Sequence, residues 1–183
     1  MQGYGAQELA RSFRTVRKNT ITIAEEIPEE KYSFRPTPEV RSVAQTLAHI
    51  AVSPRWHRRR HADGLTFIDF ATFATDMQRE AAEAATLTTK AQILDVLRRE
   101  GDEFASWIET LSDATLAEHV GFPPPVQPSS KARLEMLLAV KEHEMHHRAQ
   151  LMLIERLLGI VPHLTRERQA RMAQASQAQP QGA

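Results

Sequence analysis

The sequence predicts an all-α protein folded as a four-helix bundle. Three observations carry this prediction. Four long segments place apolar residues every three or four positions, which is the repeat of an amphipathic helix. No segment alternates apolar and polar residues as a half-buried strand does. The second and third connections are long, and the latter includes residues 121–130, which contain four of the ten prolines.

A proline-rich connection separates the first two helices. The first helix is expected over about residues 7–27, where one face carries Leu9, Phe13, Val16, Thr20, Ile23 and Ile27. The prolines that follow end this helix and keep the connection extended, because a residue before proline avoids helical backbone angles. Ser42 and Gln45 have the spacing of a capping box, so the second helix is expected to begin there and to carry His49.

The other two long helices are also marked by their ends. Residues 64–85 fit either a short helix or a packed loop, and Thr89 with Gln92 then forms a second capping box that begins the third helix. The last helix is expected over residues 131–158, with Gly159 as its C-terminal cap. The inward stripe of this last helix is Met136, Val140, His143, His147, Leu151, Ile154 and Leu158.

Length and composition limit the domain organisation and the partners. The 183 residues fit one domain, expected over residues 1–165, and the Ala- and Gln-rich residues 166–183 are expected to form a frayed or disordered tail. Basic and acidic residues both number 23, so neither nucleic acid nor an anionic membrane is expected as a partner. The absence of cysteine excludes disulfides, thiolate metal sites and a Cys nucleophile. With no apolar run long enough to span a bilayer and no signal-peptide pattern, a cytoplasmic location is expected.

Residues 141–150, which read KEHEMHHRAQ, hold three of the eight histidines in the middle of the last predicted helix. His143 and His147 are four positions apart and therefore lie one above the other on the inward face. Two imidazoles placed in this way can each direct a nitrogen at one ion, and imidazole suits Zn, Ni, Cu and Fe. Burying both without a shared partner is costly, so the spacing favours a divalent metal site. The alternative is a partly solvated helix face on which the histidines cluster incidentally.

The same residues, His143-Glu144-Met145-His146-His147, also match the H-E-x-x-H motif of metalloproteases, in which the glutamate is the general base. The sheet that normally borders a protease cleft has no candidate strands in this sequence. We therefore expect Glu144 to be an ordinary helical residue, or a partner that orients a ligand histidine through its other nitrogen.

Several stretches of the sequence closely resemble the DinB family. They are IPEEKYSFRPTPEVRS at 27–42, LAHIA at 47–51, HEMHHRAQ at 143–150, LIER at 153–156 and GIVP at 159–162. The resemblance covers essentially residues 5–162 and includes the order and spacing of the helices. One departure is Ala149, which stands where the family usually has Gly after the His-Arg pair. Because Ala is the better helix former, we expect little structural consequence beyond a narrower space beside the site.

The resemblance implies a DinB-like bundle with a metal site between the second and the last long helix. Members of the family bind a divalent metal through one histidine of the second helix and an H-x-x-x-H pair of the last, which implies the ligands His49, His143 and His147. His146 is not implied, and helical geometry agrees because it lies about 60° off the line of the other two. Zn or Ni is the expected metal, with one position left open for a small molecule. Trp56, two turns beyond His49, is expected to line the pocket.

The resemblance also implies thiol chemistry. DinB-like proteins of known activity are transferases and isomerases that use low-molecular-weight thiols such as bacillithiol or mycothiol. We therefore expect a metal-dependent transferase in which the metal activates the sulfur of a supplied thiol. The alternatives are a non-catalytic metal-binding bundle, which would be a stress-related dimeric module, and a metal-dependent hydrolase. The expected partners are a small-molecule substrate and a second copy of the chain, because many DinB-like proteins form homodimers.

Overall fold

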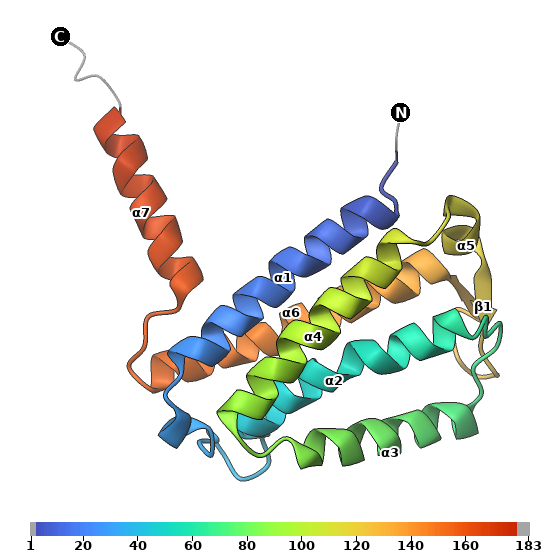
Figure 1. Ribbon diagram of the computed structural model, residues 1–183, viewed down its shortest axis with the longest axis horizontal. Coiled ribbons are helices and arrows are strands. Elements are labelled where there is room, and N and C mark those ends of the chain that lie inside the picture. Colours follow the sequence, from blue (N-terminus) through green and yellow to red (C-terminus); the bar gives the residue numbers. More distant parts are fainter. Residues whose placement is uncertain (1–2, 179–183) are drawn as a thin grey trace.

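The computed structural model describes residues 3–178 and confirms an all-α four-helix bundle, whose long helices are α1, α2, α4 and α6 (Figure 1). The elements, in chain order, are α1 (Ala6–Glu26), the 3-10 helix η1 (Glu29–Lys31), α2 (Val43–Ala62), α3 (Phe70–Thr86), α4 (Lys90–Glu109), α5 (Asp113–Ala117), β1 (His119–Gly121), β2 (Ser130–Ala132), α6 (Arg133–Leu157) and α7 (His163–Ala178). No helix within the described residues is long and apolar enough to cross a membrane.

α1 and α2 lie across the bundle from each other. α1 packs against α4 and α6, and α2 packs against the same two helices. α3 runs alongside α2 at the edge of the bundle that is farthest from α1 (Figure 1). The long connection that follows α2 therefore returns over α2 as a fifth helix, and it places α3 close to the contact between α2 and α6.

The helix ends follow the signals predicted from the sequence. The Ser42 hydroxyl accepts a hydrogen bond from the backbone N–H of Gln45, at 3.2 Å, while the Gln45 side chain accepts one from the N–H of Ser42, at 3.0 Å. Thr89 and Gln92 form the same reciprocal pair at the start of α4. Gly159 follows α6 with a φ of 79°, a left-handed conformation that suits glycine because it has no Cβ.

Two apolar clusters fill the bundle, one towards each end. Both clusters draw on α1, α4 and α6, and α2 contributes to one of them. In the first, Ile23, Leu47, Ile93 and Leu151 meet; in the second, Phe13 and Phe104 pack edge to face with ring centroids 4.9 Å apart. The burial of these side chains supplies most of the driving force for assembling the bundle.

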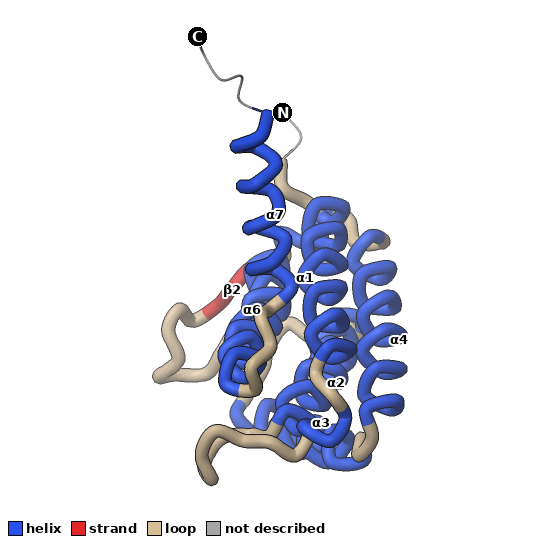
Figure 2. Tube along the Cα trace, turned by 90° about the vertical axis from the view of Figure 1, so that its left-hand side faces the viewer, coloured by secondary structure: helices blue, strands red, loops and turns tan. Residues whose placement is uncertain are grey.

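Three segments add to what the sequence analysis predicted. Residues 64–85, which fitted either a helix or a loop, contain most of α3. The proline-rich connection that includes residues 121–130 is closed by a short antiparallel pair of strands, β1 and β2, with Val120 opposite Lys131. The predicted tail is helical as far as Ala178: α7 begins at His163 and points away from the bundle, with residues 166–177 exposed (Figures 1 and 2). Their exposure agrees with a segment that has little to bury, and residues 179–183 lie outside the described part of the chain.

Candidate metal centre

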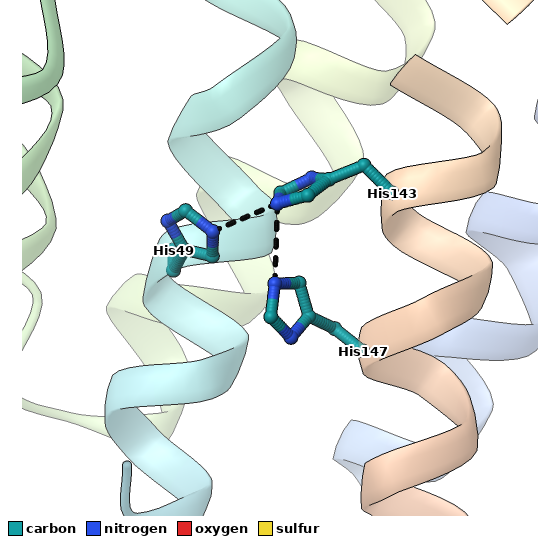
Figure 3. A group of neighbouring side chains, drawn as sticks. All are labelled: His49, His143 and His147. Atoms are coloured by element: carbon teal, nitrogen blue, oxygen red, sulfur yellow. Dashed lines mark hydrogen bonds between the residues drawn. The ribbon is translucent and has the colours of Figure 1, made fainter. Parts of the chain in front are cut away.

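Three histidines converge where α2 faces α6 (Figure 3). His49 comes from α2, and His143 and His147 come from successive turns of α6. The Nε2 atom of His143 lies 3.0 Å from Nε2 of His49 and 3.1 Å from Nε2 of His147. The structure thus brings together all three residues that the sequence analysis assigned as ligands, and we call them the histidine triad.

The triad fits a divalent transition metal. Two imidazole nitrogens that share an ion at about 2.0–2.1 Å are separated by roughly 2.8–3.4 Å for angles between octahedral and tetrahedral values. The two separations that involve Nε2 of His143 fall within this range, and the ligand atoms of all three histidines lie within 4.8 Å of one another. A neutral imidazole nitrogen without hydrogen presents a lone pair, so the convergence of three such atoms is favourable only around a cation or a shared proton. No other group of three His, Cys, Asp or Glu side chains in residues 3–178 lies this close together.

Two side chains contact the outer nitrogens of the triad, which are the Nδ1 atoms of His49 and His147. A carboxylate oxygen of Glu80, on α3, lies 2.7 Å from Nδ1 of His49, although it is off the direction of a well-formed hydrogen bond. The amide oxygen of Gln150, on α6, lies 2.8 Å from Nδ1 of His147. Both oxygens favour a proton on Nδ1, which leaves the Nε2 lone pair free for a metal. The sequence analysis had not selected either residue for this role.

The surroundings keep His143 and His147 neutral at physiological pH. Burial lowers the pKa of His143 to about 4, and the neighbouring His49 and His147 add to the effect. Burial also lowers the pKa of His147, although the hydrogen bond that Nδ1 donates to Gln150 opposes this effect. Both imidazoles are therefore in the unprotonated form that metal binding requires.

Glu144 is directed into the core, away from the triad. It is 2% exposed, and its carboxylate accepts hydrogen bonds from Nε and Nη2 of Arg17, on α1, at distances of 2.9 to 3.1 Å. The same guanidinium donates to the backbone carbonyls of Leu97 and Ile50, at 2.8 and 3.2 Å. A carboxylate held in this way cannot be the general base of a metalloprotease, so Glu144 has a structural role and the H-E-x-x-H match is incidental.

The other predicted residues lie outside the triad. His146 is exposed, with its Nε2 atom 3.1 Å from the amide nitrogen of Gln150, and it does not face the converging nitrogens. Trp56 is 4% exposed, with the guanidinium of Arg59 4.9 Å from its ring centroid. It lines neither of the cavities described next.

Two cavities border the triad. One, of about 250 Å³, is lined by His49 and Glu80, and the other, of about 520 Å³, is lined by His147 and Gln150. Arg41 lines both cavities and is exposed, and its positive charge contributes to lowering the pKa of His143 and of His147. A small molecule next to the triad would therefore meet a guanidinium. No periodicity or motif had distinguished Arg41, because its position follows from the fold of the connection before α2.

Comparisons with known proteins agree with this fold. The chain is similar to a DinB-like protein, YjoA, from Bacillus subtilis, with a TM-score of 0.62, 20% identity and coverage of 83% of this chain and 92% of that chain. It is also similar to YfiT from Bacillus subtilis, with a TM-score of 0.68, 15% identity and coverage of 87% and 91%. YfiT is described as a probable metal-dependent hydrolase with an unusual four-helix bundle topology. No curated protein matches the sequence.

The sequence model of the DinB superfamily matches residues 12–151, which include four long helices in whole or in large part and all three histidines of the triad. The resemblance noted in the sequence is thereby confirmed. The chain belongs to the DinB superfamily.

Proposed function

We propose that this protein is a metal-dependent transferase that joins a low-molecular-weight thiol to an electrophilic small molecule. The observation that carries the proposal is the convergence of three Nε2 atoms beside two cavities large enough to admit small molecules. A divalent ion held by His49, His143 and His147 would bind the sulfur of a thiol and lower its pKa, so that thiolate is available near neutral pH.

The overall reaction balances without a redox partner. The thiol gives up its proton, and a sulfur electron pair forms a bond to the electrophilic carbon. A leaving group departs with the electrons of the broken bond and is protonated. Since the chain has no cysteine, the sulfur must come from the bound thiol.

The protein's own side chains orient the triad and supply a positive charge beside it. Gln150 orients His147 through the hydrogen bond at Nδ1, and the carboxylate of Glu80 contacts Nδ1 of His49. Arg41, next to both cavities, is placed to bind a carboxylate of the thiol. Neutral ligands alone would leave the full charge of the ion uncompensated, which favours an anionic sulfur over a neutral group.

A metal-dependent hydrolase is the second candidate, because the description of YfiT names that activity and three histidines also suit the activation of water. The two functions differ in whether a thiol is required. Purified protein loaded with Zn or Ni should be assayed for displacement of chloride from chlorodinitrobenzene by a thiol and for hydrolysis of nitrophenyl esters. We expect transfer that depends on both metal and thiol and that is lost in His143→Ala. Hydrolysis without thiol would replace the proposal with the hydrolase, and inactivity in a broad panel would favour a non-catalytic metal-binding bundle.

Arg41 allows a test of how the thiol is bound. Arg41→Gln should raise the KM for thioglycolate, which carries a carboxylate, by about tenfold, because it removes a charge-assisted hydrogen bond. The KM for mercaptoethanol, which has no charge to pair, should stay within about twofold. Arg171→Gln, on the exposed part of α7, is the matched control. Equal effects of Arg41→Gln on both thiols would remove Arg41 from the binding scheme.

Two further expectations belong to this proposal. A cytoplasmic location suits a reaction that consumes reduced thiols, because that compartment keeps thiols reduced. A homodimer is expected from the habit of DinB-like proteins, and sedimentation at micromolar concentration tests it directly.

A further inference from the structure

A third cavity, of about 510 Å³, lies between α2, α3, α6 and the connection between β1 and β2. Its volume is in the range of small-molecule sites, about 300–1,000 Å³. Apolar side chains form most of its walls: Ile68, Phe70, Phe73, Phe122, Val126 and Met136. Phe70 and Phe73 are 57% and 50% exposed, so this cavity presents aromatic rings to solvent that a ligand would cover.

This apolar cavity lies next to the histidine triad along the axes of α6, α3 and α2. On α6, Ala139 lies one turn before His143, on the same face of the helix. On α3, Phe73 lies two turns before Glu80, again on one face. On α2, His57 lies about two turns beyond the histidine of the triad. At 1.5 Å per residue, the cavity begins about 6 Å from the triad along α6.

The two basic groups at the cavity are already paired with acidic side chains. Arg60 lies 2.5 Å from Asp76, Lys131 lies 2.9 Å from Glu135, and Asp69 caps α3 by accepting a hydrogen bond from the N–H of Thr72 at 2.7 Å. An anionic ligand would therefore find no unpaired basic side chain in the lining, and the carboxylate of Asp69 is held by the backbone of α3. The composition of the cavity favours an uncharged apolar group.

One polar group in the lining lacks a partner. The Nδ1 atom of His57 is buried and has no hydrogen-bond partner among the described residues. Burial lowers the pKa of His57 to about 3, with contributions from Arg60 and His61, so the ring is neutral and can donate or accept one hydrogen bond. Because the atom is buried, a ligand hydroxyl or carbonyl would reach it only if the imidazole turned Nδ1 towards the cavity, and it would then satisfy a group that otherwise remains unpaired at a free-energy cost.

We infer that the apolar cavity binds the uncharged, aromatic part of the electrophilic substrate, with a hydroxyl or carbonyl group paired to His57 and the reacting carbon directed towards the triad. That this aromatic molecule is the substrate of a reaction rests on the proposed function. Binding of an uncharged aromatic molecule in this cavity does not, because it requires neither metal nor thiol. Binding can therefore be measured separately from activity.

The probe for this site is the uncharged fluorophore N-phenylnaphthylamine, titrated into the metal-free protein. Ala139 is an exposed residue of the lining, so Ala139→Trp should fill the cavity without disturbing the core and weaken binding at least about tenfold. Phe73→Ala removes one wall and should weaken binding about threefold or more. Ala82→Trp is the matched control, because Ala82 is exposed on α3 and lines none of the cavities described here; it should leave the Kd within about twofold.

Competition between two ligands tests His57. Naphthol should displace the probe about three- to tenfold better than methylnaphthalene, because only naphthol can hydrogen-bond to the imidazole. In His57→Phe the two competitors should become equivalent while the probe still binds. If the preference for naphthol persists in His57→Phe, His57 is not the polar contact of the site.

The outcomes for the cavity are distinct from those for the proposed function. Absence of probe binding, or equal binding by wild type and Ala139→Trp, overturns the cavity as a ligand site even if thiol transfer is found. Release of the probe as the chain dimerises would assign the exposed phenylalanines to a contact between copies instead. In active protein, Ala139→Trp should raise the KM for chlorodinitrobenzene about tenfold more than that for iodoacetamide, without changing metal content.

Discussion

Glu80 on α3 lies 2.7 Å from Nδ1 of His49 on α2, so α3 contributes to the candidate metal site although none of the three histidines comes from it. Both side chains are largely shielded, at 11% and 14% exposure, which strengthens the electrostatic contact. Only two residues of α3, Asp76 and Glu80, are buried, and each contacts a basic side chain or an imidazole on α2. The inward face of α3 is thus acidic.

Glu80→Gln tests this contact. Loss of the carboxylate should weaken divalent metal binding about 10- to 100-fold, the usual effect of removing the partner that orients a ligand histidine. Isothermal titration with Zn or Ni measures the change. Glu83→Gln makes the same change in charge three residues further along α3, where the side chain pairs with Arg55, and should leave the affinity within about twofold. Equal losses in the two variants would show that only the overall charge of α3 matters.

The ligand set itself is tested by single replacements. His143→Ala and His147→Ala should each abolish stoichiometric metal binding, and His49→Ala should weaken it markedly, because each removes one of the converging Nε2 atoms. His146→Ala should retain the metal, since His146 is exposed and directed elsewhere. Metal analysis of the four purified variants gives the comparison. A loss in His146→Ala as large as in His49→Ala would mean that the ligands have been misassigned.

The buried pair of Arg17 and Glu144 should matter for stability. Their side chains are 4% and 3% exposed, so Glu144→Leu alone leaves an uncompensated buried guanidinium and should lower the free energy of unfolding by about 3–5 kcal/mol in urea titrations. The double variant Arg17→Met, Glu144→Leu should recover most of that loss. Glu135→Ala, which breaks a surface ion pair, should cost less than about 1 kcal/mol. A double variant as unstable as Glu144→Leu alone would show that the loss of stability does not come from leaving one buried charge unpaired.

Glu155 should make stability depend on pH. It is fully buried, neither of its carboxylate oxygens has a hydrogen-bond partner in residues 3–178, and burial, assisted by Glu26, raises its pKa from 4.5 to about 7. Between these values the folded chain holds a proton that the unfolded chain has released, so this contribution to stability is full below pH 4.5 and is lost as the pH rises through 7.

Glu155→Gln removes that dependence. The free energy of unfolding of Glu155→Gln minus that of wild type should rise by up to about 3 kcal/mol between acidic and mildly alkaline pH. One pKa unit corresponds to about 1.4 kcal/mol. Urea unfolding across this range measures the difference. Glu142→Gln, at an exposed position of α6, should show no such trend. A difference between wild type and Glu155→Gln that does not vary with pH would contradict the raised pKa.

The fold was largely predictable because its signals are local. Apolar side chains at helical spacing marked α1, α2, α4 and α6, and two capping boxes placed the starts of α2 and α4. α3 was ambiguous because its apolar residues are outside: Phe70, Phe73 and Met77 are exposed, while its buried side chains are acidic. The spacing of these three residues fits a helix, but the apolar face that it marks is the exposed one, so the spacing does not indicate how α3 packs.

By itself the sequence determined the pair His143 and His147, because residues four apart on a helix share a face whatever the helix packs against. It also determined that any thiol must come from outside the protein, since there is no cysteine. His49 was implied by the family resemblance, not by its periodicity. Tertiary structure alone decided that Glu80 contacts His49, that Arg41 borders the triad and that Glu144 is turned to Arg17. These contacts join different elements of the fold, and such contacts depend on how helices pack rather than on the spacing of residues within one helix.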